Sequence, residues 1–272
     1  MIFYIFSLVC SLGLSIAGSL TFWRVSHWYD FYIPIVLFIG GFLGSIIILW
    51  IIIDIIGWIT VNRKKTYEKV YKLNRWLLNN GIAYIRRLAL ITCKVNGKEK
   101  LPRHGSYLLV CNHRSNFDNF LLTEKLAMHD NLAFVAKKSN FKIPLAYWHL
   151  HKVLYLPIDR SDLMQSLQVM KLCSERIANN VTSYAIFPEG TRSKTGELGP
   201  FHEGVFNVAI KAHCPIVICT IKGTDKVKKR WPRITKTQID VVATLPPEDF
   251  EGKTAKAVSD QVREIIQYDL EK

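Results

Sequence analysis

A histidine and an aspartate stand close together in the stretch NHRSNFD, residues 112–118, between two apolar runs. A histidine acts well as a base when a carboxylate holds its other ring nitrogen and stabilises the imidazolium. A turn from strand to helix, with Ser115 or Asn116 as the helix N-cap, would bring Asp118 under His113. The spacing therefore predicts a general base and the group that orients it; a purely structural pair is the alternative.

No nucleophile of the usual kind accompanies this pair, because the sequence has no G-x-S-x-G motif. Cys111 lies two residues before His113, so a cysteine–histidine mechanism through a thioester is one alternative. The other interpretation of Cys111 is an apolar strand residue without chemistry. The simpler scheme is direct attack on an activated carbonyl by a hydroxyl that the substrate itself supplies.

A second polar stretch, FPEGTRS at residues 187–193, combines a tight turn with groups that bind anions. Gly190 shapes the turn, the guanidinium of Arg192 matches a phosphate, and Thr191 and the backbone N–H groups add donors. Glu189 is unusual in a pure anion site, and can bind a glycerol hydroxyl or hold Arg192. The stretch predicts part of a pocket for a phosphate monoester.

The elements that must position these groups follow from the apolar pattern after residue 94, where short apolar runs alternate with helical patterns. This alternation predicts an α/β domain with a largely parallel sheet. Buried strands are expected at 107–111, 132–136, 153–158, 183–187 and 215–221, and helices at 162–179, 203–212 and 253–268. The strands end in polar segments, which should meet in one cleft. Arg160 follows one strand and adds a second guanidinium to it.

The first sixty residues differ from the rest of the chain. Ile2–Trp23 and Phe31–Ile53 are uncharged over 22 and 23 residues, and about 20 apolar residues suffice for a membrane helix. Trp28 and Tyr29 in the link between them suit a membrane interface. We expect residues 1–62 to form a membrane-embedded two-helix hairpin; the alternatives are a signal peptide for the first segment and a hairpin buried in the domain.

Three basic residues, Arg63, Lys64 and Lys65, directly follow the second apolar segment. Positive residues stay on the cytoplasmic side, so we expect the large domain and the N-terminus on the cytoplasmic face of the cell membrane. A shallow hairpin that enters only one leaflet is the alternative, and Asp54 near the end of the second segment is compatible with it.

Residues 63–93 are expected to form a basic amphipathic segment on an anionic membrane surface. The apolar positions recur at helical spacing with basic ones between them: Val70, Leu73, Trp76 and Leu77, with Lys69, Lys72 and Arg75. Gly81 is expected to break this helix, and an ordinary domain-packing helix is the alternative. The segment 226–233, KVKKRWPR, is either a second surface contact or a solvated loop. The α/β domain takes the remaining residues, 94–272.

The composition narrows the class of partner. The net charge of +14 and the pI near 9.5 favour anionic partners such as nucleic acid, lipid headgroups or phosphorylated substrates. Nucleic acid is disfavoured, because no recognition motif appears and the hairpin ties the chain to a membrane. The six cysteines have no metal-ligand spacing and mostly aliphatic neighbours, which predicts reduced, buried thiols and no metal site.

Four stretches together resemble the glycerolipid acyltransferase family. They are NHRSNFD, LPIDR at 156–160, FPEGTRS and CPIVICT at 214–220, which come in the order and spacing of that family. The similarity covers about residues 90–250, and the first and third motifs are highly specific when they occur together. The resemblance implies a mixed, largely parallel α/β sheet flanked by helices, with membrane helices in front.

The resemblance also implies a reaction and its site residues. A fatty acyl group would pass from acyl-CoA or acyl carrier protein to the sn-2 hydroxyl of 1-acyl-glycerol-3-phosphate and give phosphatidic acid. His113 would be the general base and Asp118 its orienter. The acceptor phosphate and glycerol would be bound by Lys137, Arg160, Glu189, Gly190, Thr191 and Arg192. No metal or cofactor is expected beyond the acyl donor, and the expected partners are the lyso-lipid acceptor, the donor and anionic membrane lipids.

Two departures from the family pattern leave the acceptor headgroup open. His202 stands where many members have a lysine, with Glu203 beside it. The stretch LAYWHL, 145–150, lacks a glycine that many members have, so its aromatic bulk either narrows an acyl tunnel or packs the domain. The alternatives are therefore an acyltransferase acting on another lysophospholipid or lyso-lipid, and a catalytically inactive membrane lipid-binding protein.

Overall fold

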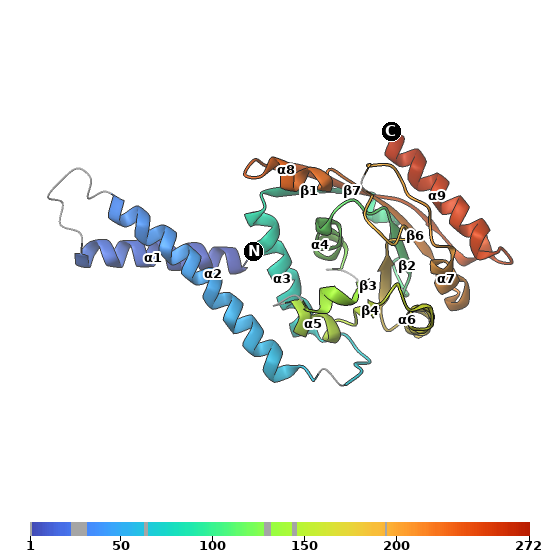
Figure 1. Ribbon diagram of the computed structural model, residues 1–272, viewed down its shortest axis with the longest axis horizontal. Helices are drawn as coiled ribbons and strands as arrows, with labels where there is room; N and C mark the ends of the chain where they lie inside the picture. The colour runs from blue at the N-terminus through green and yellow to red at the C-terminus, as the bar shows by residue number, and fades with distance from the viewer. Residues whose placement is uncertain (1, 23–31, 63–64, 128–131, 143–145, 194) are drawn as a thin grey trace.

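The computed structural model describes residues 2–22, 32–62, 65–127, 132–142, 146–193 and 195–272 (Figure 1). The expected interfacial link with Trp28 and Tyr29 lies outside these residues, as do Arg63 and Lys64. The described helices are α1 (Ile2–Phe22), α2 (Tyr32–Thr60), α3 (Lys72–Leu88), α4 (Asn116–Leu126), α5 (Ala146–Lys152), α6 (Leu163–Ala178), α7 (Asn207–Ala212), α8 (Val227–Arg230) and α9 (Ala255–Glu271). The described strands are β1 (Ile91–Asn96), β2 (Leu108–Cys111), β3 (Leu132–Lys137), β4 (Leu156–Ile158), β5 (Ser183–Ile186), β6 (Ile216–Lys222) and β7 (Thr235–Leu245).

Helices α1 and α2 pack side by side and project from the domain (Figure 1). Both are long and apolar enough to cross a membrane. Most large apolar side chains of α2 are exposed, including Trp58 at 68% and Ile59 at 71%. An exposed apolar surface of this kind is unfavourable in water. The alternative of a hairpin buried in the domain is therefore wrong.

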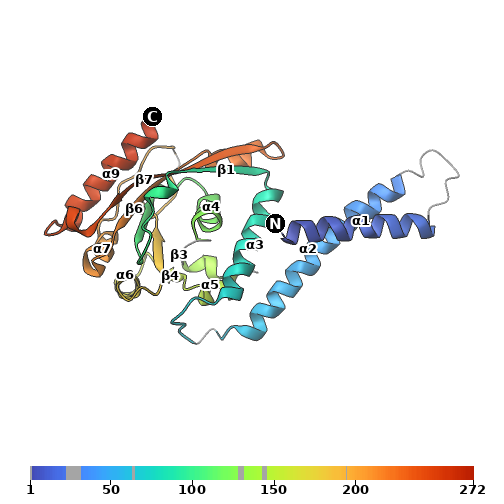
Figure 2. The ribbon, with the colours of Figure 1, turned by 180° about the vertical axis from the view of Figure 1, so that it is seen from behind.

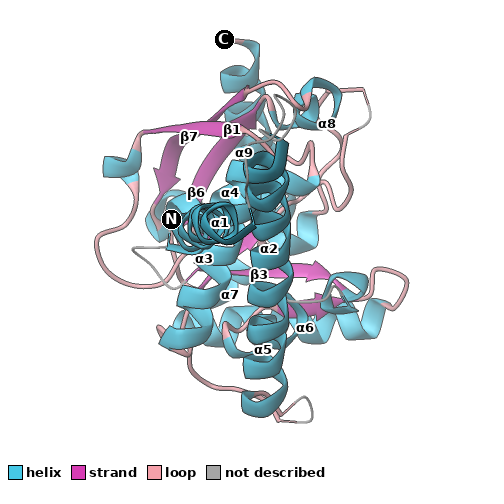
Figure 3. Ribbon diagram, turned by 90° about the vertical axis from the view of Figure 1, so that its left-hand side faces the viewer, coloured by secondary structure: helices cyan, strands magenta, loops and turns pink. Residues whose placement is uncertain are grey.

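The base of α2 is fixed to the domain through α5. Gly57 lies against Trp148, and a Cβ added at Gly57 would stand 2.5 Å from the Trp148 Cβ. His149 Nε2 lies 3.4 Å from the Ile53 carbonyl oxygen, and its Nδ1 lies 2.9 Å from Asn74 Nδ2 of α3. Figure 3 shows α1 and α2 in front of α3 and α5, from the side on which the hairpin projects.

Helix α3 continues through Gly81, so the expected break there is wrong. Leu78 and Ile82 on its inner face are buried, and this packing outweighs the cost of one glycine in a helix, about 1 kcal/mol. Arg75, expected on the basic outer face, is buried instead and donates to the Leu132 carbonyl oxygen at 2.8 Å. This face of α3 packs against the domain, in agreement with the alternative of a domain-packing helix.

Within the described residues the sheet has the strand order β1-β7-β6-β2-β5-β3-β4. All recorded neighbours pair in parallel except β6 and β7, which are antiparallel. The predicted fold class, a mixed and largely parallel sheet flanked by helices, is confirmed. Strands β1 and β7 were not among the expected strands. Each is only partly buried, and their alternating sequences lack the continuous apolar runs that marked the other strands.

The expected strand at 153–158 is shorter in the structure, since β4 begins at Leu156. Leu154 has a positive φ of 63°, because the chain reverses there after α5 and cannot yet be extended. The other expected strands agree with β2, β3, β5 and β6 to within one residue at each end.

The helices form a layer on each face of the sheet. Helices α3, α4 and α5 lie on one side, and α6, α7 and α9 lie on the other (Figures 1 and 2). Because β2, β5, β3 and β4 are parallel neighbours, their carboxyl ends share one edge of the sheet. The polar segments that follow these strands are therefore brought together, as the sequence predicted.

Candidate active site

The turn between β2 and α4 places a histidine against a carboxylate. His113 Nδ1 lies 2.8 Å from Asp118 Oδ2. Ser115 is the N-cap of α4, as expected, and its hydroxyl accepts a hydrogen bond from the Phe117 N–H at 3.3 Å. Asp118 is in the first turn of this helix, which brings its carboxylate back toward the end of the strand.

Asp118 is fixed by more than the histidine. Its side chain is fully buried, and Oδ2 also accepts hydrogen bonds from the backbone N–H groups of Arg114 at 2.6 Å and Ser115 at 2.7 Å. With Nδ1 donating to this carboxylate, the neutral imidazole has its lone pair on Nε2. That nitrogen makes no hydrogen bond with any residue in the described ranges. The geometry suits a base held in one tautomer.

Phe187 supports the imidazole from the next strand. Its ring stacks on that of His113, with centroids 4.1 Å apart and an interplanar angle of 13°. Phe187 was not among the predicted site residues, although it is the first residue of FPEGTRS. An aromatic residue at the end of β5, the strand beside β2, was the available signal.

Glu189 connects the two polar segments. Its carboxylate is buried, with Oε1 accepting from the His113 N–H at 2.7 Å and Oε2 accepting from the Gly199 N–H at 3.0 Å. The Ser193 N–H donates to the His113 carbonyl oxygen at 2.9 Å across the same junction. Both carboxylate oxygens thus hold backbone groups, where the sequence suggested contact with glycerol or Arg192.

Asn112 is a further positioning residue that the sequence analysis did not assign. It is buried, donates through Nδ2 to the Ile221 carbonyl oxygen at 3.1 Å, and accepts the Ile221 N–H at 2.8 Å. The side chain continues the pairing of β2 with β6 beyond the last strand residue. It fixes the backbone immediately before His113.

Three cations lie at the same edge of the sheet, and we call Lys137, Arg160 and Arg192 the cationic rim. All three are exposed, and none forms a hydrogen bond or ion pair with another residue in the part of the chain that the structure describes. Thr191 is also exposed. The structure thus brings His113 into contact with the residues that hold it, while the rim residues reach into solvent around them.

A cavity of about 710 Å³ adjoins this site. Its lining is mainly apolar and comes from α6, α7, the segment 202–205 and the ends of β3, β4 and β5; Arg160, Phe187 and Gly190 are part of it. Gly190 has φ of 68°, and a Cβ added there would stand 2.7 Å from His202 Nε2. The position therefore requires glycine, and His202 lies directly beside the predicted site.

Cys111 does not have the properties of a nucleophile. Its side chain is completely buried, and burial raises the pKa of its thiol well above the ordinary value, so that it stays protonated near pH 7. All six cysteines are free thiols, and four of them, including Cys111, are buried. The geometry gives no support to the cysteine–histidine alternative.

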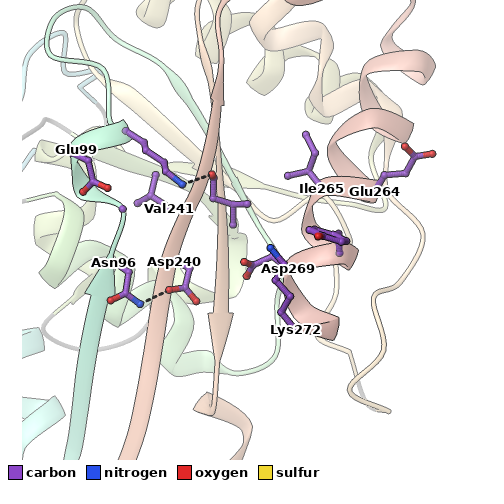
Figure 4. Close-up of a pocket in the computed structure, with 12 residues that line it drawn as sticks. Asn96, Glu99, Asp240, Val241, Glu264, Ile265, Asp269 and Lys272 are labelled. Atoms are coloured by element: carbon purple, nitrogen blue, oxygen red, sulfur yellow. Dashed lines mark hydrogen bonds between the residues drawn. The ribbon is translucent and has the colours of Figure 1, made fainter.

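A second cavity, of about 580 Å³, lies between α9 and the β1–β7 pair (Figure 4). Asn96 and Asp240 are joined there by a hydrogen bond of 2.5 Å, and Lys100 donates to a backbone oxygen. None of the predicted site residues lines this cavity. Two of the predicted site residues, Arg160 and Gly190, line the first cavity instead.

Comparisons with known proteins agree with this arrangement. A model of the Acyltransferase family matches residues 92–222. The chain is 34% identical to a chloroplastic 1-acyl-sn-glycerol-3-phosphate acyltransferase of Brassica napus over 134 residues, which are 49% of this chain and 38% of that protein. It is 29% identical to 1-acyl-sn-glycerol-3-phosphate acyltransferase alpha of Ovis aries over 70% of this chain and 67% of that protein.

The whole fold has a counterpart among solved structures. The 1-acyl-sn-glycerophosphate (LPA) acyltransferase PlsC from Thermotoga maritima superimposes with a TM-score of 0.60 at 22% identity, over 97% of this chain and 96% of that one. The chain spans 36 to 59% of the lengths of the chloroplastic and algal relatives that it matches. The chain is therefore similar to the acyltransferase family over residues 92–222, a range that includes the His113–Asp118 pair.

Proposed function

We propose that this protein transfers a fatty acyl group from a thioester donor to the sn-2 hydroxyl of 1-acyl-glycerol-3-phosphate, giving phosphatidic acid. The observation that carries the proposal is the His113 ring, which is fixed on one side by buried Asp118 and has Nε2 free. The names of the relatives from Brassica napus and Ovis aries support the same acceptor. The acyl donor is acyl-CoA or acyl carrier protein.

The proposed mechanism needs one base. Nε2 of His113 removes the proton from the acceptor hydroxyl as its oxygen attacks the thioester carbonyl. Asp118 stabilises the imidazolium that forms. The tetrahedral intermediate then breaks its carbon–sulfur bond, and the departing thiolate takes up the proton that His113 removed. Because a thiolate leaves readily, we propose no metal or further cofactor.

Charge on the reacting oxygen requires hydrogen-bond donors. The backbone N–H groups of Thr191 and Arg192 donate to no other group within the described residues. They follow Gly190, whose positive φ turns the chain at the site. We propose that these donors and the cationic rim bind the acceptor phosphate or the developing oxyanion, roles that suit groups without internal partners.

The cavity fits an amphiphilic substrate. Its mainly apolar lining suits an acyl chain, while Arg160, Lys171 and Lys211 contribute three cations to the lining against one acid, Glu203. His202 also lines the cavity, in place of the lysine that the resemblance suggested. This observation favours a second candidate, an acyltransferase of the same mechanism that acts on another lyso-lipid.

We propose that the α1–α2 hairpin holds the enzyme in the cell membrane, with the domain on the cytoplasmic face. The exposed apolar side chains of both helices and the basic residues after α2 support this placement. Labelling of single cysteines in intact cells would test it. Reaction of a cysteine at exposed Glu251 with a membrane-impermeant reagent before cell lysis would contradict the cytoplasmic assignment.

The activity is tested with the purified full chain in mixed micelles, using labelled acyl-CoA and labelled acyl carrier protein in parallel. Acceptors are 1-acyl-glycerol-3-phosphate and a panel of lysophospholipids with other headgroups. The variant is His113→Ala, and the matched control is His104→Ala, since His104 is exposed before β2 at the opposite end of that strand.

We expect phosphatidic acid from the wild type and the control, but not from His113→Ala. Product from another lyso-lipid only would support the second candidate. Equal activity of His113→Ala and wild type would refute the mechanism. Binding of lyso-lipid without transfer to any acceptor would indicate a lipid-binding protein.

A further inference from the structure

Two segments that are distant in the sequence form an exposed apolar surface beside α8. Leu88 and Leu90 lie at the end of α3 and are 36% and 38% exposed. Trp231 and Ile234 follow α8 and are 61% and 58% exposed. We call these four residues the Trp231 patch. The acyl-transfer mechanism uses none of them.

Two hydrogen bonds join the two segments of the patch and hold its side chains in a fixed arrangement. Trp231 Nε1 donates to the Leu88 carbonyl oxygen at 3.2 Å. The Thr235 N–H donates to the Leu90 carbonyl oxygen at 2.9 Å, where β7 begins to pair with β1. Exposure of large apolar side chains to water is unfavourable. Side chains that are held in this exposed arrangement therefore indicate a surface that a partner covers.

Four cations stand next to Trp231 and Ile234 in the sequence. Lys228, Lys229, Arg230 and Arg233 are exposed, and none of them pairs with an acidic side chain among the described residues. The nearest acid in the sequence, Asp225, is exposed in the preceding turn. Tryptophan and aliphatic groups amid unpaired cations are complementary to the headgroup region of an anionic bilayer.

The position of the patch in the fold is compatible with contact to a bilayer. Helix α8 and the C-terminal end of α3 lie on the side of the domain from which the α1–α2 hairpin projects (Figures 1 and 2). The outer face of α3 adds exposed Leu73 and Trp76 on the same helix. An acidic carrier protein would satisfy the cations, but continuity with the apolar hairpin favours lipid.

We propose that the Trp231 patch inserts into the headgroup region of an anionic bilayer, as a membrane contact separate from the hairpin. The contact would hold the domain in one orientation against the membrane, because hairpin and patch touch it at two places. Electrostatic attraction falls off within a Debye length, so only a domain lying close to the bilayer would benefit.

The test uses the full chain reconstituted into vesicles, with Cys10 and Cys93 replaced by serine because these two thiols are only half-buried. A spin label is placed at Ile234→Cys or, as the matched control, at Glu251→Cys, which is exposed before α9. Vesicles contain phosphatidylcholine alone or phosphatidylcholine with phosphatidylglycerol. The measurement is collision of the label with oxygen and with a water-soluble nickel chelate.

We expect the label at position 234 to lose nickel accessibility and gain oxygen accessibility in the anionic vesicles, while the label at 251 stays accessible to nickel. The triple variant Lys228→Glu, Lys229→Glu, Arg230→Glu should return the label at 234 to water. Circular dichroism establishes that the variants are folded. None of these readouts depends on acyl transfer, so failure here is distinguishable from failure of the proposed function.

Two outcomes would overturn the proposal. Equal nickel accessibility at positions 234 and 251 in anionic vesicles would show that the patch stays in water. Protection of position 234 by added acyl carrier protein, but not by anionic lipid, would assign the patch to an acidic protein.

Discussion

The His113–Asp118 turn and the cationic rim share one edge of the sheet but differ in how far their bonding capacity is used. Asp118 is buried, and one of its oxygens accepts three hydrogen bonds. The rim residue Arg160 is exposed and has no partner among the described residues. The turn is organised before substrate arrives, whereas the rim has its donors free.

This difference matches two tasks that the proposed acyl transfer would require of the site. A base must have its proton acceptor in position when the hydroxyl arrives, and a fixed imidazole costs no reorganisation at that moment. Groups that bind a charged headgroup are kept hydrated until the ligand displaces the water. We therefore expect changes in the turn to lower kcat and changes in the rim to raise KM.

The largest effect is expected for His113→Ala. Loss of the base should lower kcat by about 10³ to 10⁴-fold, in the upper range for general-base catalysis. Single-turnover acyl transfer to 1-acyl-glycerol-3-phosphate measures the effect. His104→Ala should remain within about twofold of wild type, and a similar loss in both variants would indicate damage to folding.

Asp118→Asn tests the orientation of the imidazole. The amide presents N–H groups to a site where three donors already converge on one oxygen, which disturbs the tautomer of His113. We expect kcat to fall by about 10² to 10³-fold, with KM for the acceptor nearly unchanged. An unchanged kcat in a folded variant would remove Asp118 from the mechanism.

Glu189→Gln distinguishes a positioning residue from an acceptor ligand. The amide can satisfy only one of the two backbone N–H groups that the carboxylate holds, so the variant should lose about 1–3 kcal/mol of unfolding free energy. Displacement of His113 should lower kcat by about tenfold or more. A rise in acceptor KM with unchanged kcat and thermal stability would assign Glu189 to the acceptor instead.

Arg160→Ala addresses the rim. Removing one charge-assisted hydrogen bond to phosphate, about 1.5–3 kcal/mol, should raise acceptor KM by about 10- to 100-fold with little change in kcat. Arg103→Ala is the control, because Arg103 is exposed before β2 and away from the rim. A proportional fall in kcat would place Arg160 in the transition state rather than in the ground-state complex.

The smallest effect is expected for Cys111→Ala. Because burial raises the pKa of this thiol, it remains neutral up to pH values well above 7 and contributes no thiolate. Activity should stay within about threefold of wild type, and mass spectrometry should find no acylated Cys111 after incubation with donor alone. An acyl-enzyme at this position would revive the cysteine–histidine alternative.

Local spacing explains what the sequence predicted of the site. His113 and Asp118 belong to one strand-to-helix turn, so their contact follows from a short segment with an N-cap. The common edge for the polar segments followed from parallel strands, which apolar runs reveal. The resemblance to the acyltransferase family rested on motifs that are specific in combination.

Contacts between distant segments account for what the sequence did not predict. The stacking of Phe187 on His113 depends on β5 lying beside β2, and the role of Asn112 depends on β6 lying on the other side. Arg75 is buried because its position on α3 faces the domain, where it donates to the Leu132 carbonyl oxygen. Strand order and helix rotation decide these contacts, and neither follows from local pattern.

The packing of Gly57 on Trp148 has a consequence for how the proposed enzyme would meet its lipid substrate. A domain that packs against the proposed membrane hairpin at this point cannot move away from it on a flexible linker. Its site would therefore stay at a constant height above the bilayer. The search for a lyso-lipid then becomes diffusion in two dimensions. Collision frequency would be set by the surface density of substrate in the leaflet instead of its bulk concentration.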